Sequence, residues 1–187
     1  MADERISWFP LLDEAGMSGE VRALHQKVRE RTGVVPNVFK SYAWKPDRFL
    51  KWFAHYRDVM APSEGLSAAD REMIGVVVSA ENRCLYCVTA HGAALRELTG
   101  DPVLAAQVQT DYRRAQLDAR RRAMCDFAVK LTRTPYDLGR EDVDTLCRAG
   151  FSESDAWDIA EVTAEFNFSN RMASATGMMP NPEYYAK

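Results

Sequence analysis

The sequence predicts an all-α fold, and three observations support this prediction. Apolar residues recur at spacings of three and four along most of the chain, as on the buried face of a helix. Capping residues and glycine or proline stops bracket these stretches. No series of segments alternates strictly between apolar and polar residues, as half-buried strands do. With 187 residues the chain has room for one domain of ordinary size.

The N-terminal part is expected to hold two helices. Ser18 can cap the first, which ends near Gly33. The second is predicted at about residues 47 to 60 and is closed by Pro62. It carries an aromatic patch that includes His55, for which we expect packing, with the lining of a substrate pocket as the alternative role.

The next segment is expected to form two helices joined by a corner. Ser67 followed by Asp70 resembles a capping box and marks the start of the first helix. The β-branched stretch at 74–78 is assigned to this helix because it lacks the alternation of a strand. The chain is predicted to turn near residue 82, and the second helix ends at Gly100.

The remainder of the chain is also expected to be helical. Residues 102–133 are predicted to form one or two helices, and further helices are predicted at about 140–149 and 154–176. Arginines cluster between residues 113 and 122, but aspartates flank and separate them, and the chain has a net charge of −3 and a pI near 5.7. We therefore expect no nucleic-acid partner.

Two segments resemble each other at an offset of 85 residues. The identical pairs include Ser67 with Ser152 and Asn82 with Asn167. We interpret the similarity as a duplicated helical unit whose second copy lacks the reactive residues of the first. The single domain is then expected to comprise three parts: an N-terminal helical arm at 1–62, an active helical unit at 65–100, and a degenerate second unit with a C-terminal tail at 102–187.

Reactive residues gather in the first of these units. Cys84 and Cys87 form a CxxC, and His91 follows four residues later, so on a helix the three share one face. If the two helices fold back on each other near residue 82, Glu72 comes to lie opposite His91, since both helices rise about 1.5 Å per residue. The carboxylate then orients the imidazole, which can take a thiol proton.

This set of side chains suits thiol redox chemistry. A free thiol, with a pKa of about 8.5, is mostly protonated at pH 7, and a helix N-terminus or a neighbouring base lowers that pKa. Attack of the thiolate on a hydroperoxide leaves a sulfenic acid, with which a second cysteine condenses to form a disulfide. One cysteine of the pair would react and the other would resolve.

Other uses of the cysteines have less support. A zinc-binding module fits the cysteines and the histidine but requires a fourth ligand. Cys125 and Cys147 have no partner histidine nearby and are expected to be core thiols. A thioredoxin-like domain would need its CxxC after a strand. We therefore expect no metal and no other cofactor, with zinc kept as an alternative.

The expected location is the cytoplasm. No apolar run approaches the roughly 20 residues of a membrane span. The first residues carry acids where a signal peptide has a basic start. No membrane partner is expected.

At the reactive residues the chain resembles the AhpD-like (alkylhydroperoxidase D-like) family of the carboxymuconolactone decarboxylase superfamily, in its peroxidase-related branch. Four stretches carry the resemblance: VPNVF at 35–39, LSAADRE at 66–72, ENRCLYCVTAH at 81–91 and FNFSNR at 166–171. The resemblance implies an all-helical fold, a homo-oligomer such as a trimer or hexamer, and thiol-dependent peroxidase activity on organic hydroperoxides or hydrogen peroxide.

The resemblance also implies roles for single residues. Cys87 would be the peroxidatic cysteine and Cys84 the resolving one, and Glu72 and His91 would relay the proton. Tyr86 stands where the best-known alkylhydroperoxidases have a histidine; we expect it in the substrate pocket, where its pKa near 10 makes it a poor base.

The resemblance leaves the reductant and the activity partly open. A dithiol, such as a lipoyl group on another protein, would reduce the oxidised cysteine pair. A redox sensor or a decarboxylase-like enzyme on the same scaffold is the alternative, although the founding decarboxylases lack the CxxC pair.

Overall fold

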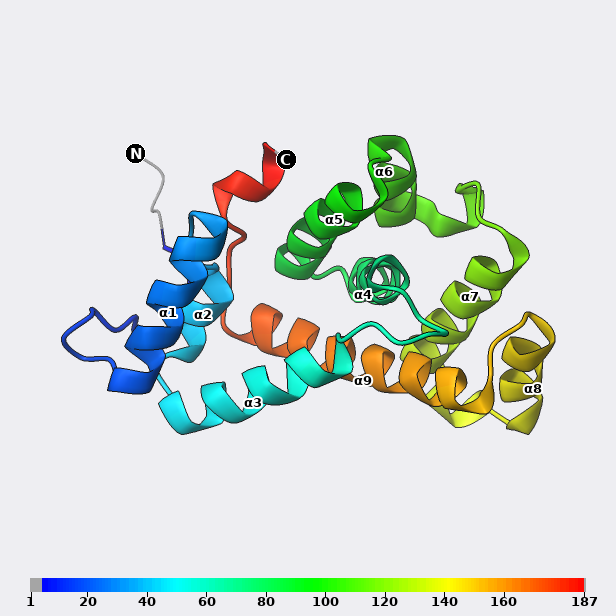
Figure 1. The fold of residues 1–187 in the computed structure, drawn as a ribbon, viewed down its shortest axis with the longest axis horizontal. Helices are drawn as coiled ribbons and strands as arrows, with labels where there is room; N and C mark the ends of the chain where they lie inside the picture. The colour runs from blue at the N-terminus through cyan, green and yellow to red at the C-terminus, as the bar shows by residue number, and fades with distance from the viewer. Residues whose placement is uncertain (1–4, 187) are drawn as a thin grey trace.

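The structure, a computed structural model, describes residues 5–186, which form helices and short 3-10 turns with no β-strand (Figure 1). The all-α prediction is therefore confirmed. No helix in this range is long and apolar enough to cross a membrane. The α-helices are α1 (Gly19–Thr32), α2 (Asn37–Tyr42), α3 (Pro46–Val59), α4 (Ala68–Glu81), α5 (Leu85–Thr99), α6 (Pro102–Asp111), α7 (Ala119–Arg133), α8 (Arg140–Arg148) and α9 (Glu153–Ala175).

Helix α4 lies at the centre of the molecule. Figure 1 looks along it, with α5, α6, α7 and α9 packed around it. Every residue from 73 to 79 is buried. A helix covered on all sides has no polar face, so its sequence reads as a continuous apolar run. The predicted capping box is present, because the Asp70 N–H donates to Ser67 Oγ at 3.2 Å and the Ser67 N–H donates to Asp70 Oδ2 at 3.2 Å.

The predicted corner joins α4 to α5. Asn82 ends α4, and Arg83 has a φ of 53°, in the left-handed region that non-glycine residues seldom adopt. The Cys84 N–H donates to the Ser79 carbonyl at 2.9 Å, and Cys84 becomes the N-cap of α5. The corner thereby places the first turn of α5 against the last turn of α4.

The N-terminal helices form a second, smaller core. Val21 of α1, Phe39 of α2 and Phe49 of α3 are buried together, apart from the main core around α4. Helices α1 and α3 agree with the predictions, but α2 was not predicted. The Asn37 N–H, in the first turn of α2, donates to Asn181 Oδ1 at 2.7 Å. This contact joins α2 to the C-terminal segment across 144 residues, a distance that local sequence signals do not cover.

The two segments that resemble each other in sequence at an offset of 85 residues have similar structures only where they begin. Helices α4 and α9 begin with the same capping box, at Ser67 and at Ser152. Helix α4 then ends at Asn82, whereas α9 continues through Asn167 to residue 175. The corner of the first segment has no counterpart in the second, because Phe168, at the position that corresponds to Arg83, lies within the continuous helix α9. The two asparagines themselves meet, with Asn82 Nδ2 donating to Asn167 Oδ1 at 3.0 Å.

Candidate active site

The structure pairs Glu72 of α4 with His91 of α5. Glu72 Oε2 lies 2.7 Å from His91 Nδ1, and the two side chains are only 14% and 16% exposed. A carboxylate can only accept a hydrogen bond, so Nδ1 carries the proton. The other ring nitrogen, Nε2, is then left to exchange protons with a reacting group. The predicted approach of these two residues across the corner is confirmed.

Packing fixes the plane of the His91 ring. The ring of Phe166 in α9 meets it edge-on, with the centroids 4.6 Å apart and the planes at 86°. Phe166 reaches this position because Gly75 has no side chain: a Cβ there would stand 2.3 Å from the Phe166 ring. A glycine on α4 therefore makes room for the phenylalanine of α9 that packs against the imidazole.

The two cysteines of the CxxC lie at the start of α5. Both thiols are free, and the residues are 2% and 3% exposed. Cys84 is the N-cap with an extended backbone, whereas Cys87 lies within the first helical turn. A hydrogen bond connects their thiols. The pair therefore has the proximity that disulfide formation requires.

This hydrogen bond separates the two pKa values. The Cys87 thiol donates to the sulfur of Cys84 and so lowers the pKa of Cys84 to about 7, with Ser174 donating a further hydrogen bond. The same interaction, together with burial, raises the pKa of Cys87 well above its usual value. The pair thus loses one proton near neutral pH, and the resulting charge lies mainly on Cys84.

Helix α9 and the end of α4 supply polar partners that the sequence analysis did not single out. Asn170 is 1% exposed, and its Nδ2 donates to Ser79 Oγ at 2.9 Å. Both side chains hydrogen-bond to Cys87 and work against the rise of its pKa. Ser174, one turn further along α9, hydrogen-bonds to Cys84 and lowers its pKa. The sequence offered one signal for these partners, because Asn170 is a polar residue within the FNFSNR stretch at 166–171.

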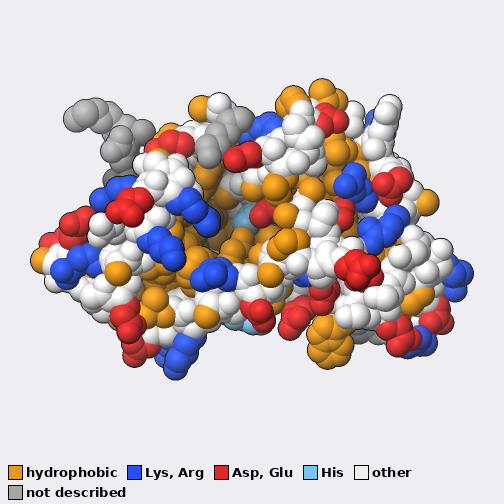
Figure 2. All heavy atoms as spheres, viewed as in Figure 1, with side chains coloured by type: hydrophobic (Ala, Val, Ile, Leu, Met, Phe, Trp, Pro, Cys, Tyr) orange, Lys and Arg blue, Asp and Glu red, His pale blue; other side chains and the backbone are white. Residues whose placement is uncertain are grey.

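Cys87, His91 and Glu72 line one cavity of about 330 Å³, which we call the aromatic cavity. Figure 2 shows this face of the molecule hollowed between the N-terminal helices and α5, with hydrophobic side chains around the hollow. The N-terminal helices and α9 contribute the aromatic wall, made of Phe39, Tyr42, Trp52, Phe53, Tyr56 and Phe166. A reacting molecule in this cavity is surrounded by apolar rings and faces one thiol, one imidazole and one carboxylate.

Cys84 does not line the aromatic cavity. The expectation that both sulfurs and the imidazole point into one space is therefore wrong for Cys84. The helical spacing rule assumes that all three residues are helical, and the N-cap has a different backbone conformation, with φ −84° and ψ 99°. Cys84 opens instead onto a separate cavity beside the C-terminal segment.

The two residues considered for the substrate pocket, Tyr86 and His55, lie in different places. Tyr86 lines the aromatic cavity, where its hydroxyl accepts a hydrogen bond from the Val38 N–H at 3.2 Å. Burial raises its pKa well above the usual value, so the ring serves as a wall. His55 lies outside the cavity, half exposed and 3.8 Å from Glu165. His55 does not line the aromatic cavity, because Trp52 and Tyr56, on another face of α3, form the cavity wall there; His55 lines a separate hollow beside Glu165.

The remaining cysteines stand apart from the site. Cys125 is fully buried in the main core, as predicted. Cys147 is only half-buried, so its assignment to the core was too strong. Among residues 5–186, no three histidine, cysteine, aspartate or glutamate side chains are grouped as metal ligands would be. The zinc alternative therefore finds no ligand set in the described part of the chain.

Comparison with known proteins gives consistent results. The model of the carboxymuconolactone decarboxylase family matches residues 47–108. The crystal structure of an alkylhydroperoxidase AhpD core, a peroxidase-related protein from Ralstonia eutropha JMP134, shares 42% identity over 98% of this chain and 96% of that one, with a TM-score of 0.95. A peroxidase-related protein from Silicibacter sp. TM1040 shares 43% identity over 100% and 98%, with a TM-score of 0.94.

More distant similarity extends to the fold alone. The debrominase Bmp8 shares 18% identity over 100% of this chain and 97% of that one, with a TM-score of 0.79. No curated protein matches the chain. The family match spans the segment that holds Glu72, both cysteines of the CxxC and His91. The chain belongs to the AhpD-like family of the carboxymuconolactone decarboxylase superfamily.

Proposed function

We propose that the protein is a thiol peroxidase that reduces hydroperoxides through a Cys84–Cys87 disulfide. The single observation that carries this proposal is the shared cavity of Cys87, His91 and Glu72. A nucleophilic sulfur, a proton donor and the group that orients the donor face the same enclosed space. Fold similarity alone does not choose the reaction, since a debrominase shares the fold.

The first step is attack by Cys87. The Cys87 proton passes to His91 Nε2, and the Cys87 thiolate attacks the distal oxygen of the hydroperoxide. The O–O bond breaks, and the departing alkoxide takes a proton from His91 Nε2 to leave as an alcohol. Cys87 is now a sulfenic acid. Glu72 stabilises the imidazolium before the transfer and keeps Nδ1 protonated after it.

The second step forms the disulfide. The Cys84 sulfur attacks the sulfenic sulfur of Cys87, and hydroxide leaves and is protonated to water. A dithiol then reduces the disulfide and becomes a disulfide itself. The sum is one hydroperoxide and one dithiol converted into one alcohol, one water and one oxidised dithiol. The Cys84 thiol proton passes to the leaving hydroxide, so the step releases one water.

Steady-state peroxide consumption tests the proposal. Cumene hydroperoxide and a dithiol such as dihydrolipoamide are supplied, and the wild type is compared with Cys87→Ser. We expect Cys87→Ser to lose the activity because serine is not nucleophilic under these conditions. Cys147→Ser is the matched control, since it removes a half-buried thiol far from the CxxC pair, and it should retain wild-type turnover.

The products of single turnover provide a second readout. Mass spectrometry after one equivalent of peroxide should find the Cys84–Cys87 disulfide in the wild type and a trapped sulfenic acid on Cys87 in Cys84→Ser. Equal rates for the wild type and Cys87→Ser would contradict the peroxidase. Disulfide formation without turnover would instead point to a redox sensor.

A further inference from the structure

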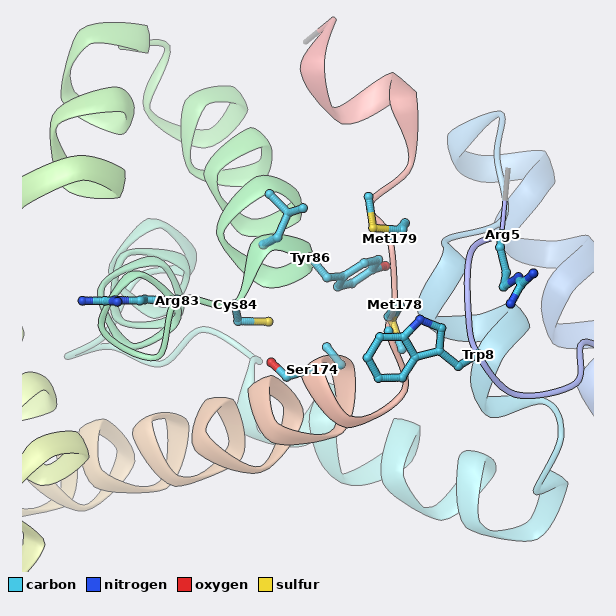
Figure 3. Close-up of a pocket in the computed structure, with 11 residues that line it drawn as sticks. Arg5, Trp8, Arg83, Cys84, Tyr86, Ser174, Met178 and Met179 are labelled. Carbon is cyan, nitrogen blue, oxygen red and sulfur yellow. The ribbon is translucent and has the colours of Figure 1, made fainter. Parts of the chain in front are cut away.

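The two cysteines of the pair open onto different cavities. Cys87 lines the aromatic cavity, whereas Cys84 lines a second one of about 460 Å³, the Cys84 cavity (Figure 3). Three residues line both cavities and so form the partition between them: Tyr86, Ala173 and Met178. Tyr86 is held in this partition by the hydrogen bond between its hydroxyl and the Val38 N–H.

Chain segments from both ends of the described range build the outer wall of the Cys84 cavity. The Trp8 N–H donates to the Thr176 carbonyl at 2.8 Å, and the Met179 N–H donates to the Ile6 carbonyl at 3.2 Å. The indole of Trp8 lies over Gly177, where a Cβ would stand 2.2 Å from the ring. Figure 3 shows Cys84 and Ser174 on one side of the cavity and Trp8 and Met179 on the other.

The rim of this cavity is accessible and combines apolar side chains with two arginines, Arg5 and Arg83. Trp8, Leu85 and Met179 are 69%, 53% and 45% exposed, whereas Cys84 below them is 2% exposed. A thiol at the bottom of such a hollow is out of reach of a dithiol on the broad surface of a folded protein. A narrow dithiol, either free or carried on an extended arm, can enter.

Disulfide exchange has a directional requirement. The attacking thiolate approaches along the line of the S–S bond, from the side opposite the sulfur that leaves. In a Cys84–Cys87 disulfide, attack on Cys84 therefore comes from the Cys84 side of the pair, where the Cys84 cavity lies. The leaving sulfur is then Cys87, which shares the aromatic cavity with His91 and can take a proton from it.

We propose that the reductant enters through the Cys84 cavity and attacks Cys84, so that oxidant and reductant reach the disulfide through separate openings. This inference rests on the proposed function. The first reductant thiolate forms a mixed disulfide with Cys84 and releases the Cys87 thiolate, which takes a proton relayed from the solvent through His91. The second reductant thiol loses its proton to the solvent and attacks the reductant sulfur bound to Cys84, which releases the Cys84 thiolate and closes an oxidised dithiol. Ser174 donates a hydrogen bond to the released Cys84 sulfur.

The first test identifies which sulfur is attacked. The disulfide is formed with diamide, so that the measurement does not require any peroxide turnover. The oxidised protein is mixed with a monothiol, N-acetylcysteamine, quenched in acid and digested, and tandem mass spectrometry locates the adduct. We expect the adduct on Cys84, and an adduct on Cys87 overturns the proposal. The proposed peroxidase could fail its own test while this result still stands.

The second test blocks each opening in turn. Met179→Trp narrows the Cys84 cavity, and Ala94→Leu narrows the aromatic cavity, which Ala94 lines. Reduction of the diamide-formed disulfide by dihydrolipoamide should slow about tenfold in Met179→Trp, a change of about 1.4 kcal/mol in the barrier. It should keep the wild-type rate in Ala94→Leu and in Met179→Ala.

Oxidation of the reduced protein completes the crossed design. Single-turnover oxidation by cumene hydroperoxide, followed by tryptophan fluorescence, should slow in Ala94→Leu and keep its wild-type rate in Met179→Trp. A wild-type reduction rate in Met179→Trp would overturn the proposal, as would equal slowing of reduction by both narrowing variants. Thermal unfolding of the variants checks that a slow rate does not come from loss of the folded state.

Discussion

The charge on the cysteine pair depends on one hydrogen bond between two buried thiols. Cys87 donates to Cys84, so the Cys84 thiol has a pKa of about 7 while the pKa of the Cys87 thiol is raised. Buried polar side chains, Asn170 and Ser79, offset part of that rise. Cys87 therefore faces the aromatic cavity as a thiol that is hydrogen-bonded to the sulfur of Cys84.

The ionisation of this pair can be measured directly. Thiolate absorbance at 240 nm in the reduced protein should show a first step near pH 7, because Cys84 is a thiol below its pKa and a thiolate above it. Cys87→Ala removes the donor and should move this step to higher pH. Cys84→Ser should abolish the step, whereas a step that persists would assign the ionisation to another cysteine.

The proton relay can be tested at the same scale. His91→Gln should lower kcat/KM for the hydroperoxide about 100-fold, because a positioned acid or base typically contributes that much or more. Glu72→Gln keeps the imidazole but weakens its orientation, so a smaller loss is expected. His55→Gln is the matched control, since this exposed histidine lies outside the cavity, and it should leave kcat/KM unchanged. Three equal values would contradict the relay.

Among the elements, α4 and α9 orient His91 through one close contact between them. Gly75 on α4 admits the ring of Phe166 on α9, and that ring meets His91 edge-on. The packing of two helices therefore sets the orientation of a side chain on a third.

Gly75→Ala tests this contact. The added methyl meets the Phe166 ring at 2.3 Å, so we expect a loss of about 1–3 kcal/mol in the free energy of unfolding from overpacking. Urea unfolding measures this loss, and activity should fall as His91 is displaced. Gly19→Ala in the first turn of α1, with no atom within 4 Å of the new Cβ, should show neither effect. Unchanged stability in Gly75→Ala would mean that the helices move apart without cost.

The whole molecule presents large apolar side chains to its surface. Phe9, Trp44, Phe168 and Met172 are exposed and line a groove of about 490 Å³ next to α3 and α9. Contiguous exposed apolar surface commonly marks an interface. Together with the family membership, this surface leads us to expect a homo-oligomer, a trimer or hexamer.

Sedimentation velocity at micromolar concentration measures the assembly state. The mass should be a multiple of the 21.1 kDa chain, and Phe168→Asp should shift the distribution toward smaller species because it places a charge in the apolar groove. Lys51→Asp, on the exposed side of α3, is the control and should leave the distribution unchanged. A sharp monomer peak in the wild type would contradict the expected assembly.

The sequence by itself determined the features that depend on near neighbours. The Ser67–Asp70 capping box, the corner at Asn82 and the Gly100 stop are local signals, and each is present in the structure. The pairing of Glu72 with His91 could also be predicted from the sequence. Two helices of equal rise that fold back about a known corner bring together residues that are equally far from that corner.

Only the tertiary structure decided what surrounds these residues. Asn181 places α2, Asn170 reaches Cys87 from α9, and His55 falls outside the cavity, all through contacts between segments distant in the chain. The opening of Cys84 and Cys87 onto different cavities depends on the partition of Tyr86, Ala173 and Met178, which α5, α9 and the C-terminal segment bring together. Periodicity and caps report what a residue does to its own helix, whereas a cavity is the space left between several helices, and no local pattern encodes that space.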